Sequence, residues 1–299
     1  MKKPLIAAIA TLAVAAGAQA ESKFYGKMNV SVAYDEASEK FGVNSHASRL
    51  GVKGSDDLGG SKVIYQAEYE TAPDDGDATG GGTAIKQRDI YVGLAYDGMG
   101  TVKMGMMDTP LKKSQGKFDL FNDVFDFKRV LDGENRVANS LNYTTEKMGG
   151  VQVSASAVLA EDGSSDGYSA NATFKSGGIY AGVAYDTKIK QESVQRVTVI
   201  YNMGDMTVGA LINNVDTDDV SAGDDELGYA VNASMKAGKN TIKLQYEAAD
   251  QKSTGVTSLS VGVDHKLGKA TKAFAYINQS ESDLSDANAQ LALGLVHKF

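Results

Sequence analysis

Ala289-Gln290-Leu291-Ala292-Leu293-Gly294-Leu295-Val296-His297-Lys298-Phe299 is the stretch that decides the fold of this chain. One set of alternate residues in it contains three leucines and ends at the aromatic Phe299, whereas the other set consists of Gln, Ala, Gly, Val and Lys. Successive side chains of a β-strand point to opposite faces, so this alternation predicts a strand with one apolar face.

The same alternation recurs along most of the chain, and helical spacing is hard to find. Apolar residues take one parity and Lys, Arg, Gln, Glu, Asn or Ser take the other. A soluble β-sandwich also alternates, but its second face seldom carries so many charged residues. A sheet with one apolar face and one wet face is therefore favoured. The clearest segments are 24–34, 62–70, 136–143, 196–203, 242–247 and 258–267.

The connections between these segments fall into two classes that follow each other in turn. The tight ones contain glycine, which supplies the positive φ that short hairpins need, and they lie at 59–60, 98–100, 148–150, 177–178, 204–205, 238–239 and 268–269. The long ones are polar and lie at 36–45, 73–84, 161–167, 216–226, 250–255 and 281–287. Short turns at one end and long loops at the other are typical of outer-membrane barrels. The sequence predicts an all-β fold, a transmembrane antiparallel β-barrel of about sixteen strands.

The start of the chain predicts export. Met1-Lys2-Lys3 precedes an apolar run from Leu5 to Ala16, and Ala18-Gln19-Ala20 forms a small-x-small cleavage site. This pattern is that of a signal peptide over residues 1–20, followed by a barrel domain over 21–299. An exported chain of amphipathic strands that finishes in an apolar strand with Phe299 indicates the outer membrane of a Gram-negative bacterium.

Charge and composition exclude several classes of function. The formal net charge is −8, and loss of Lys2 and Lys3 with the signal peptide makes it −10. A chain with so negative a net charge is a poor nucleic-acid binder, and the excess of acidic over basic residues mildly favours cations as solutes. Cysteine is absent, so no disulfide framework is expected. No catalytic motif or cofactor site stands out, and we expect neither an enzyme nor a cofactor. The three histidines suggest no metal triad, and whether the Asp-rich loops near 74–77 and 216–219 hold a divalent cation stays open.

The segment Ser48-Arg49-Leu50-Gly51-Val52-Lys53-Gly54-Ser55-Asp56-Asp57-Leu58-Gly59-Gly60 resembles the second-strand signature of the general trimeric porins of Gram-negative outer membranes. Tyr25-Gly26-Lys27, residues 88–94 with 100–102, residues 136–143 and Phe299 are similar to the same family in order and spacing. The resemblance spans the mature chain and is strongest before Tyr143. It implies a sixteen-stranded homotrimer for passive diffusion of ions and small hydrophilic solutes, with Phe299 read by the outer-membrane assembly machinery.

One connection, about 108–135, is much longer than the others and is too apolar for an exposed loop. Phenylalanine, leucine and valine alternate with carboxylates over it, and residues 118–125 also fit a short helical turn. We expect this third loop to fold into the barrel with its apolar side on the wall, as the resemblance also implies. The carboxylates expected at the lumen are Asp119, Asp123 and Asp126.

A basic cluster is expected on the opposite wall. Lys27, Arg49, Lys53 and Arg136 lie on the polar parity of their strands, while Arg88 shares parity with apolar neighbours and reaches the lumen only if a bulge intervenes. The resemblance places Lys27, Arg49, Arg88 and Arg136 in the basic cluster of the family. Opposed acidic and basic walls create a transverse field across a narrow pore.

Three alternatives to a general diffusion channel stay open: one is another channel, and two belong to other functional classes. A substrate-specific channel for anions or oligosaccharides uses the same architecture, whereas an adhesin or receptor barrel uses its loops, and an outer-membrane hydrolase needs a catalytic cluster. Only the channel hypotheses predict ion current. The expected partners are two further copies of the chain, outer-membrane lipid and lipopolysaccharide, the assembly machinery and the permeating solutes, with no nucleic acid.

Overall fold

The computed structural model of this chain describes residues 21–299 except 79–82, 162–165, 191, 218–225 and 251–254. The predicted signal peptide lies outside the described residues, as do parts of the polar loops predicted at 73–84, 161–167, 216–226 and 250–255. The strands are β1 (Glu21–Asp35), β2 (Lys40–Ser45), β3 (Ser48–Asp57), β4 (Ser61–Thr71), β5 (Ile85–Tyr96), β6 (Gly100–Asp108), β7 (Arg136–Thr144), β8 (Val151–Val158), β9 (Gly167–Ser176), β10 (Ile179–Ile189), β11 (Glu192–Met203), β12 (Met206–Thr217), β13 (Glu226–Ala237), β14 (Asn240–Ala249), β15 (Val256–Lys266), β16 (Thr271–Ser282) and β17 (Ser285–Lys298).

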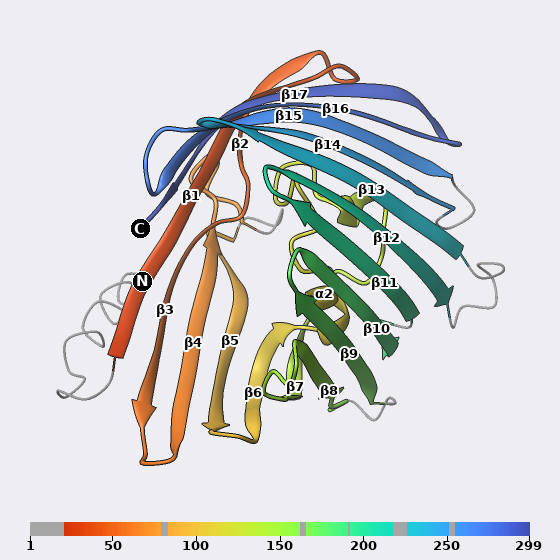
Figure 1. Cartoon of the computed structure of the whole chain (residues 1–299). Helices are drawn as coiled ribbons and strands as arrows, with labels where there is room; N and C mark the ends of the chain where they lie inside the picture. The colour runs from red at the N-terminus through yellow and green to blue at the C-terminus, as the bar shows by residue number, and fades with distance from the viewer. Residues whose placement is uncertain (1–20, 79–82, 162–165, 191, 218–225, 251–254) are drawn as a thin grey trace.

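The strands form one closed antiparallel sheet (Figure 1). Neighbours in sequence pair from β3 to β17, and β1 closes the barrel by pairing with β17 from Lys27 opposite Lys298 to Asp35 opposite Gln290. Strands β2 and β3 both pair with β1 and are separated only at residues 46 and 47, where Ala47 has a φ of 50°. They are two halves of one crossing, so the described residues make the predicted sixteen-stranded antiparallel β-barrel.

The two parities of strands such as β1 and β17 face different surroundings, as the alternation predicts. In β17, Leu293 and Leu295 are about half exposed on the outside, whereas Ala292 and Val296 are buried inside. In β1, Lys27 and neighbouring polar residues are buried inside, while Val32 is 52% exposed. The outer surface is therefore an apolar belt around the barrel, and the inner surface is polar. Within the described residues, no helix is both long and apolar enough to cross a membrane.

The connections at the loop end are more varied than the sequence predicts. The connection expected at 36–45 is a turn over 36–39, because residues 40–45 extend the sheet as β2. The connection expected at 281–287 contains only residues 283 and 284 outside the strands, with a register shift between Ser280 and Ser282. Polar residues here continue strands beyond the apolar belt, and polarity alone did not distinguish strand extensions from loops.

The long segment between β6 and β7 has its own local structure. Helix α2 (Pro110–Ser114) begins after Thr109, whose hydroxyl accepts a hydrogen bond from the Lys112 amide, and the 3₁₀ helix η1 (Phe127–Arg129) begins after Asp126 in the same way. The helical turn expected over 118–125 is reduced to turns around Phe121, where the amides of residues 124 and 125 donate to its carbonyl. In Figure 1 this segment, drawn in yellow-green, lies inside the barrel.

Candidate functional site

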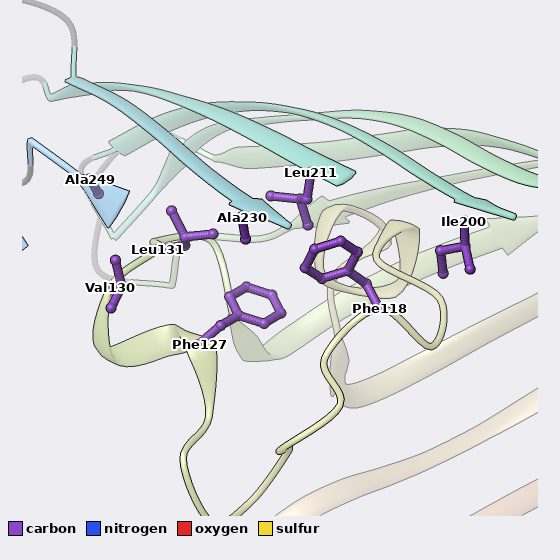
Figure 2. Packing of buried hydrophobic residues seen from close by; sticks show 8 residues of the cluster. All are labelled: Phe118, Phe127, Val130, Leu131, Ile200, Leu211, Ala230 and Ala249. Atoms are coloured by element: carbon purple, nitrogen blue, oxygen red, sulfur yellow. The ribbon is translucent and has the colours of Figure 1, made fainter. Parts of the chain in front are cut away.

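The segment 109–135, called here the inner loop, packs its apolar side on the inner wall of the barrel. Four of its residues meet inward-facing residues of β11, β12, β13 and β14 (Figure 2). Farther along, Phe121, Val124 and Phe125 pack on Phe274 and Tyr276 of β16 and on two residues of β17. All of these side chains are at most 7% exposed. The cluster in Figure 2 consists of Phe118, Phe127, Val130, Leu131, Ile200, Leu211, Ala230 and Ala249.

Polar side chains of the wall satisfy the backbone of the inner loop. The Asn232 amide donates to the Phe118 carbonyl at 2.6 Å, and the Lys243 ammonium donates to the Leu120 carbonyl at 2.6 Å. The Gln245 side-chain oxygen accepts the Leu120 amide at 2.8 Å. A buried backbone group without a partner costs free energy, so these bonds allow an irregular segment to lie inside the barrel.

Arg196 of β11 fixes the far end of the inner loop. Its Nη1 lies 2.5 Å from Glu134 Oε1, its Nη2 donates to the Asp132 carbonyl at 2.7 Å, and its Nε donates to Asn213 Oδ1 at 3.1 Å. The guanidinium also lies over the Phe127 ring, 5.4 Å from its centroid. The sequence analysis did not predict a role for Arg196. The available indication was that Arg196 is a charged residue on the polar parity of a strand whose other parity is apolar.

A cavity of about 760 Å³ lies between the inner loop and the wall formed by β2 to β7. Its lining contains eight lysine or arginine residues and five carboxylates. The basic residues are Arg49, Lys86, Arg88, Lys112, Lys113, Lys128, Arg136 and Lys190. The acidic residues are Glu70, Asp108, Asp123, Asp126 and Glu134.

The structure brings three of the five predicted basic residues to this cavity: Arg49, Arg88 and Arg136. Arg88 reaches it because the register of β4 and β5 shifts between Ala67 and Tyr69, the bulge on which its inward direction depended. Arg88 then binds Glu68 at 2.7 Å and Glu70 at 2.6 Å.

Lys27 and Lys53 lie apart from the cavity lining. Lys27 is buried inside the barrel and forms an ion pair with Asp123 of the inner loop. Lys53 is exposed and lies over the Tyr25 ring, 5.0 Å from its centroid. Lys53 has the inward parity that was expected. It lies closer than Arg49 to the short turn that follows β3, and it does not line the cavity.

The three predicted carboxylates divide in a similar way. Asp123 and Asp126 line the cavity, whereas Asp119 does not. The Asp119 carboxylate accepts hydrogen bonds from the Phe121 amide at 3.0 Å, from Gln245 Nε2 at 3.0 Å and from the Phe127 amide at 3.3 Å. Its oxygens are thus used to shape the inner loop and attach it to β14.

Four carboxylates near the basic wall were not predicted: Glu68, Glu70, Asp89 and Asp108. Arg136 binds Asp89 at 2.6 Å and Asp108 at 2.8 Å, and the Tyr25 hydroxyl donates to Glu68 at 2.9 Å. Glu68 and Glu70 lie on the polar parity of β4, and the Gly59-Gly60 turn sets Glu70 opposite Arg49. The position of that turn fixes which residues of β3 and β4 are opposite each other, so it could have predicted that Glu70 lies beside Arg49.

The family model described as "Gram-negative porin" matches residues 6–285 of this chain. Outer membrane porin protein 32 of Delftia acidovorans is 28% identical over 319 residues, which cover 92% of this chain and 88% of that protein. The solved anion-selective porin from Comamonas acidovorans is similar with a TM-score of 0.78 and 22% identity over 94% of this chain and 100% of that one. The trimer form of OmpT, an outer membrane protein of Vibrio cholerae, has a TM-score of 0.72 and 18% identity, covering 94% of this chain and 100% of that one.

Proposed function

Because the chain belongs to the Gram-negative porin family, we propose that the cavity beside the inner loop is the constriction of its pore and favours small hydrophilic anions. The chain is an outer-membrane channel for passive diffusion of solutes. The proposal concerns what narrows that channel and which solutes it prefers. It is carried by one observation, the excess of basic over acidic residues in the cavity lining.

Within the described ranges of the chain, ion pairing neutralises all the carboxylates of the cavity lining but leaves some of its lysines unpaired. Every lining carboxylate has a cationic partner: Glu70 with Arg88, Asp108 with Arg136 and Lys112, Asp123 with Lys27, Asp126 with Lys128, and Glu134 with Arg196. Among the described residues, no ion pair involves the lining residues Lys86, Lys113 and Lys190. The uncompensated charge at the constriction is therefore positive.

The local charge outweighs the acidic balance of the whole chain, which by itself favours cations. Exposed charges farther than the Debye length of about 8 Å at physiological ionic strength are largely screened. A narrow cleft with low-dielectric walls focuses the field of the groups that line it. The similar porin from Comamonas acidovorans is anion-selective, which agrees with this direction.

Loop deletion tests whether the inner loop narrows the pore. Removal of Lys117 to Asp126 takes away the segment that packs on β16 and β17 together with two lining carboxylates. The single-channel conductance of the folded variant should rise above that of the unaltered chain. An unchanged conductance in protein that shows heat-modifiable gel mobility contradicts the proposed constriction.

A charge variant tests the proposed selectivity. In Lys86→Gln/Lys113→Gln, two unpaired ammonium groups are lost from the lining, and the reversal potential under a KCl gradient should move toward that of a cation-preferring pore. The matched control is Lys147→Gln/Lys175→Gln, which removes two exposed lysines near short turns. Equal reversal potentials in the two variants contradict the assignment.

We also propose that the chain assembles as a homotrimer. The trimer form of the similar Vibrio cholerae protein supports this state, as do the motifs quoted from the sequence. Limited cross-linking of the purified protein should give a ladder that ends at three copies, and single channels should close in three equal steps. A ladder that ends at one copy, with single closing steps, contradicts a trimer.

A further inference from the structure

A second cavity, of about 280 Å³, lies at the short-turn end of the barrel, away from the inner loop. Four chain segments contribute to it: the turn before β14, the end of β15, the turn that leads into β16, and the end of β17. Its lining contains one carboxylate, Asp264, and five lysines. The lysines are Lys239, Lys266, Lys269, Lys272 and Lys298, and the cavity is called here the lysine pocket.

The single carboxylate does not neutralise the lysine pocket. Asp264 lies 2.8 Å from the Lys272 ammonium and 2.9 Å from that of Lys243, which stands deeper in the barrel, and it also accepts a hydrogen bond from the Tyr276 hydroxyl. Among the described residues, no ion pair involves the other four lysines of the pocket. The pocket therefore carries several positive charges without counter-charges.

The strand register holds these like charges close together. Lys266 and Lys272 are directly opposite each other in the β15–β16 ladder. The Lys266 amide donates to the Lys239 carbonyl at 2.9 Å, and the Lys298 amide donates to the Ala270 carbonyl at 2.9 Å, so the four segments adjoin. Like charges directly opposite in a sheet are destabilising, and a bound anion relieves that repulsion.

The pocket opens toward the lumen. Lys266 has the parity of Asp264, whose partners Lys243 and Tyr276 are buried inside the barrel. Lys298 has the parity of the buried Val296, opposite to that of the lipid-side Leu295. A solute that has passed the constriction therefore meets the lysine pocket at the mouth on the short-turn side, which faces the periplasm in outer-membrane barrels.

We propose that the lysine pocket binds the phosphate groups of small solutes at the periplasmic mouth. This inference extends the proposed anion preference to a second site and rests on it for the route of the ligand. Lysine ammonium groups act as compact point charges that bind phosphate without a fixed fork geometry. The hydroxyl of Thr241, which has the parity of the inward-facing Lys243, lines the same cavity and supplies a further hydrogen-bond donor. Several phosphate oxygens can thus be bound at once by donors from different strands.

The test is isothermal titration calorimetry of the folded mature protein in neutral detergent, with inorganic pyrophosphate as the probe. The unaltered chain should bind it, and Lys266→Gln/Lys269→Gln should bind at least about tenfold more weakly, the loss expected for a charge-assisted hydrogen bond. The matched control Lys147→Gln/Lys175→Gln removes two exposed lysines at the same end of the barrel and should bind as the unaltered chain does. No binding, or equal affinity in both variants, overturns the proposal.

A single variant distinguishes a loss of pyrophosphate binding from a defect in folding. Lys269 lies in the turn between β15 and β16, outside the hydrogen-bonded ladder, so Lys269→Gln removes a pocket charge without altering a strand. Weaker pyrophosphate binding by this variant, in protein with unaltered heat-modifiable mobility, supports the site, and unaltered binding overturns it.

A lipid phosphate is the competing source of the same chemistry. Detergent micelles doped with phosphatidylglycerol should leave pyrophosphate binding unchanged, because the pocket opens on the lumen side. Displacement of pyrophosphate by the lipid overturns the assignment to a permeating solute.

Calorimetry and current recordings together distinguish a failure of the lysine pocket from a failure of the proposed selectivity. Pyrophosphate binding without anion-selective current refutes only the selectivity. Anion-selective current without pyrophosphate binding refutes only the lysine pocket.

Discussion

Arg196 shows how single residues determine the shape of the pore. Its side chain is fully buried between the inner loop and the wall, and its charge is compensated by Glu134 and by two oxygen acceptors. Loss of one member of a buried ion pair is costly because the other charge is left without a partner. Arg196 thus influences the shape of the pore from behind the inner loop, without lining the cavity.

Replacement of Arg196 by methionine should destabilise the folded protein by about 3–5 kcal/mol, since Glu134 then stays buried without its cation. The measurement is thermal unfolding followed by circular dichroism in detergent. The control is Lys128→Met in the same loop, whose side chain is 60% exposed and lies 3.4 Å from Asp126, and whose loss should cost about 0.5 kcal/mol or less. Equal losses in the two variants contradict the anchoring role of Arg196.

Asp123 is the residue for which a pH dependence follows. Burial acts to raise the pKa of its carboxyl, but the Lys27 ammonium and then Arg49 more than offset this and hold the pKa below its usual value. A depressed carboxyl pKa contributes stability above the ordinary value of about 3.9, and that stability is lost as the pH falls through the folded-state pKa.

Asp123→Asn should therefore lower the free energy of unfolding near pH 6 by about 1–3 kcal/mol, and the difference from the unaltered chain should shrink as the pH falls below about 4. Asparagine suits the site because Asp123 has a φ of 73°, in the left-handed region that asparagine tolerates. Denaturant unfolding at several pH values measures the difference. A difference that grows on acidification contradicts the ion pair with Lys27 as its cause.

At the scale of elements, the inner loop depends on close approach to the wall. A Cβ atom on Gly182 of β10 would lie 2.6 Å from the carbonyl oxygen of Ser114, which closes helix α2. Such a contact is too short to persist, and the nearest atom is backbone and cannot rotate away. The loop and the barrel wall are therefore fitted to each other at this glycine.

Gly182→Ala should displace helix α2 from the wall, lower the stability by about 1–3 kcal/mol and increase the noise of the open channel. The control is Gly268→Ala, since a Cβ atom there meets nothing within 4 Å and the backbone φ is not in the left-handed region. Thermal unfolding and current recordings of both variants provide the readout. An unaltered Gly182→Ala protein contradicts the docking of the loop at this position.

The sequence predicted elements better than the contacts between them. Alternation predicted the strands and the polar inner face, because burial on one side repeats every second residue, and the turns and loops between the strands predicted their number. The apolar content of residues 108–135 predicted a loop with a buried side. Which carboxylate faces the cavity could not be predicted, because it depends on tertiary contacts: Asp119 bonds to Gln245 and to backbone amides, whereas Asp123 pairs with Lys27.

At the scale of the molecule, charge is distributed unevenly over an acidic chain. The formal net charge is −8, yet the main cavity is lined by more cations than carboxylates, and the lysine pocket repeats this excess at the periplasmic mouth. In the part of the chain that the structure describes, β1 pairs with β17 and closes the sheet, so the inner wall that carries these charges is continuous. Local placement, rather than total charge, sets the expected selectivity.

The most direct test of a basic, loop-narrowed pore is the single-channel current of the purified protein in a planar bilayer, with the reversal potential under a KCl gradient. We predict steady open channels whose reversal potential has the sign of chloride preference. A reversal potential with the sign of potassium preference contradicts the proposed constriction, and an absence of current from folded protein contradicts an open pore.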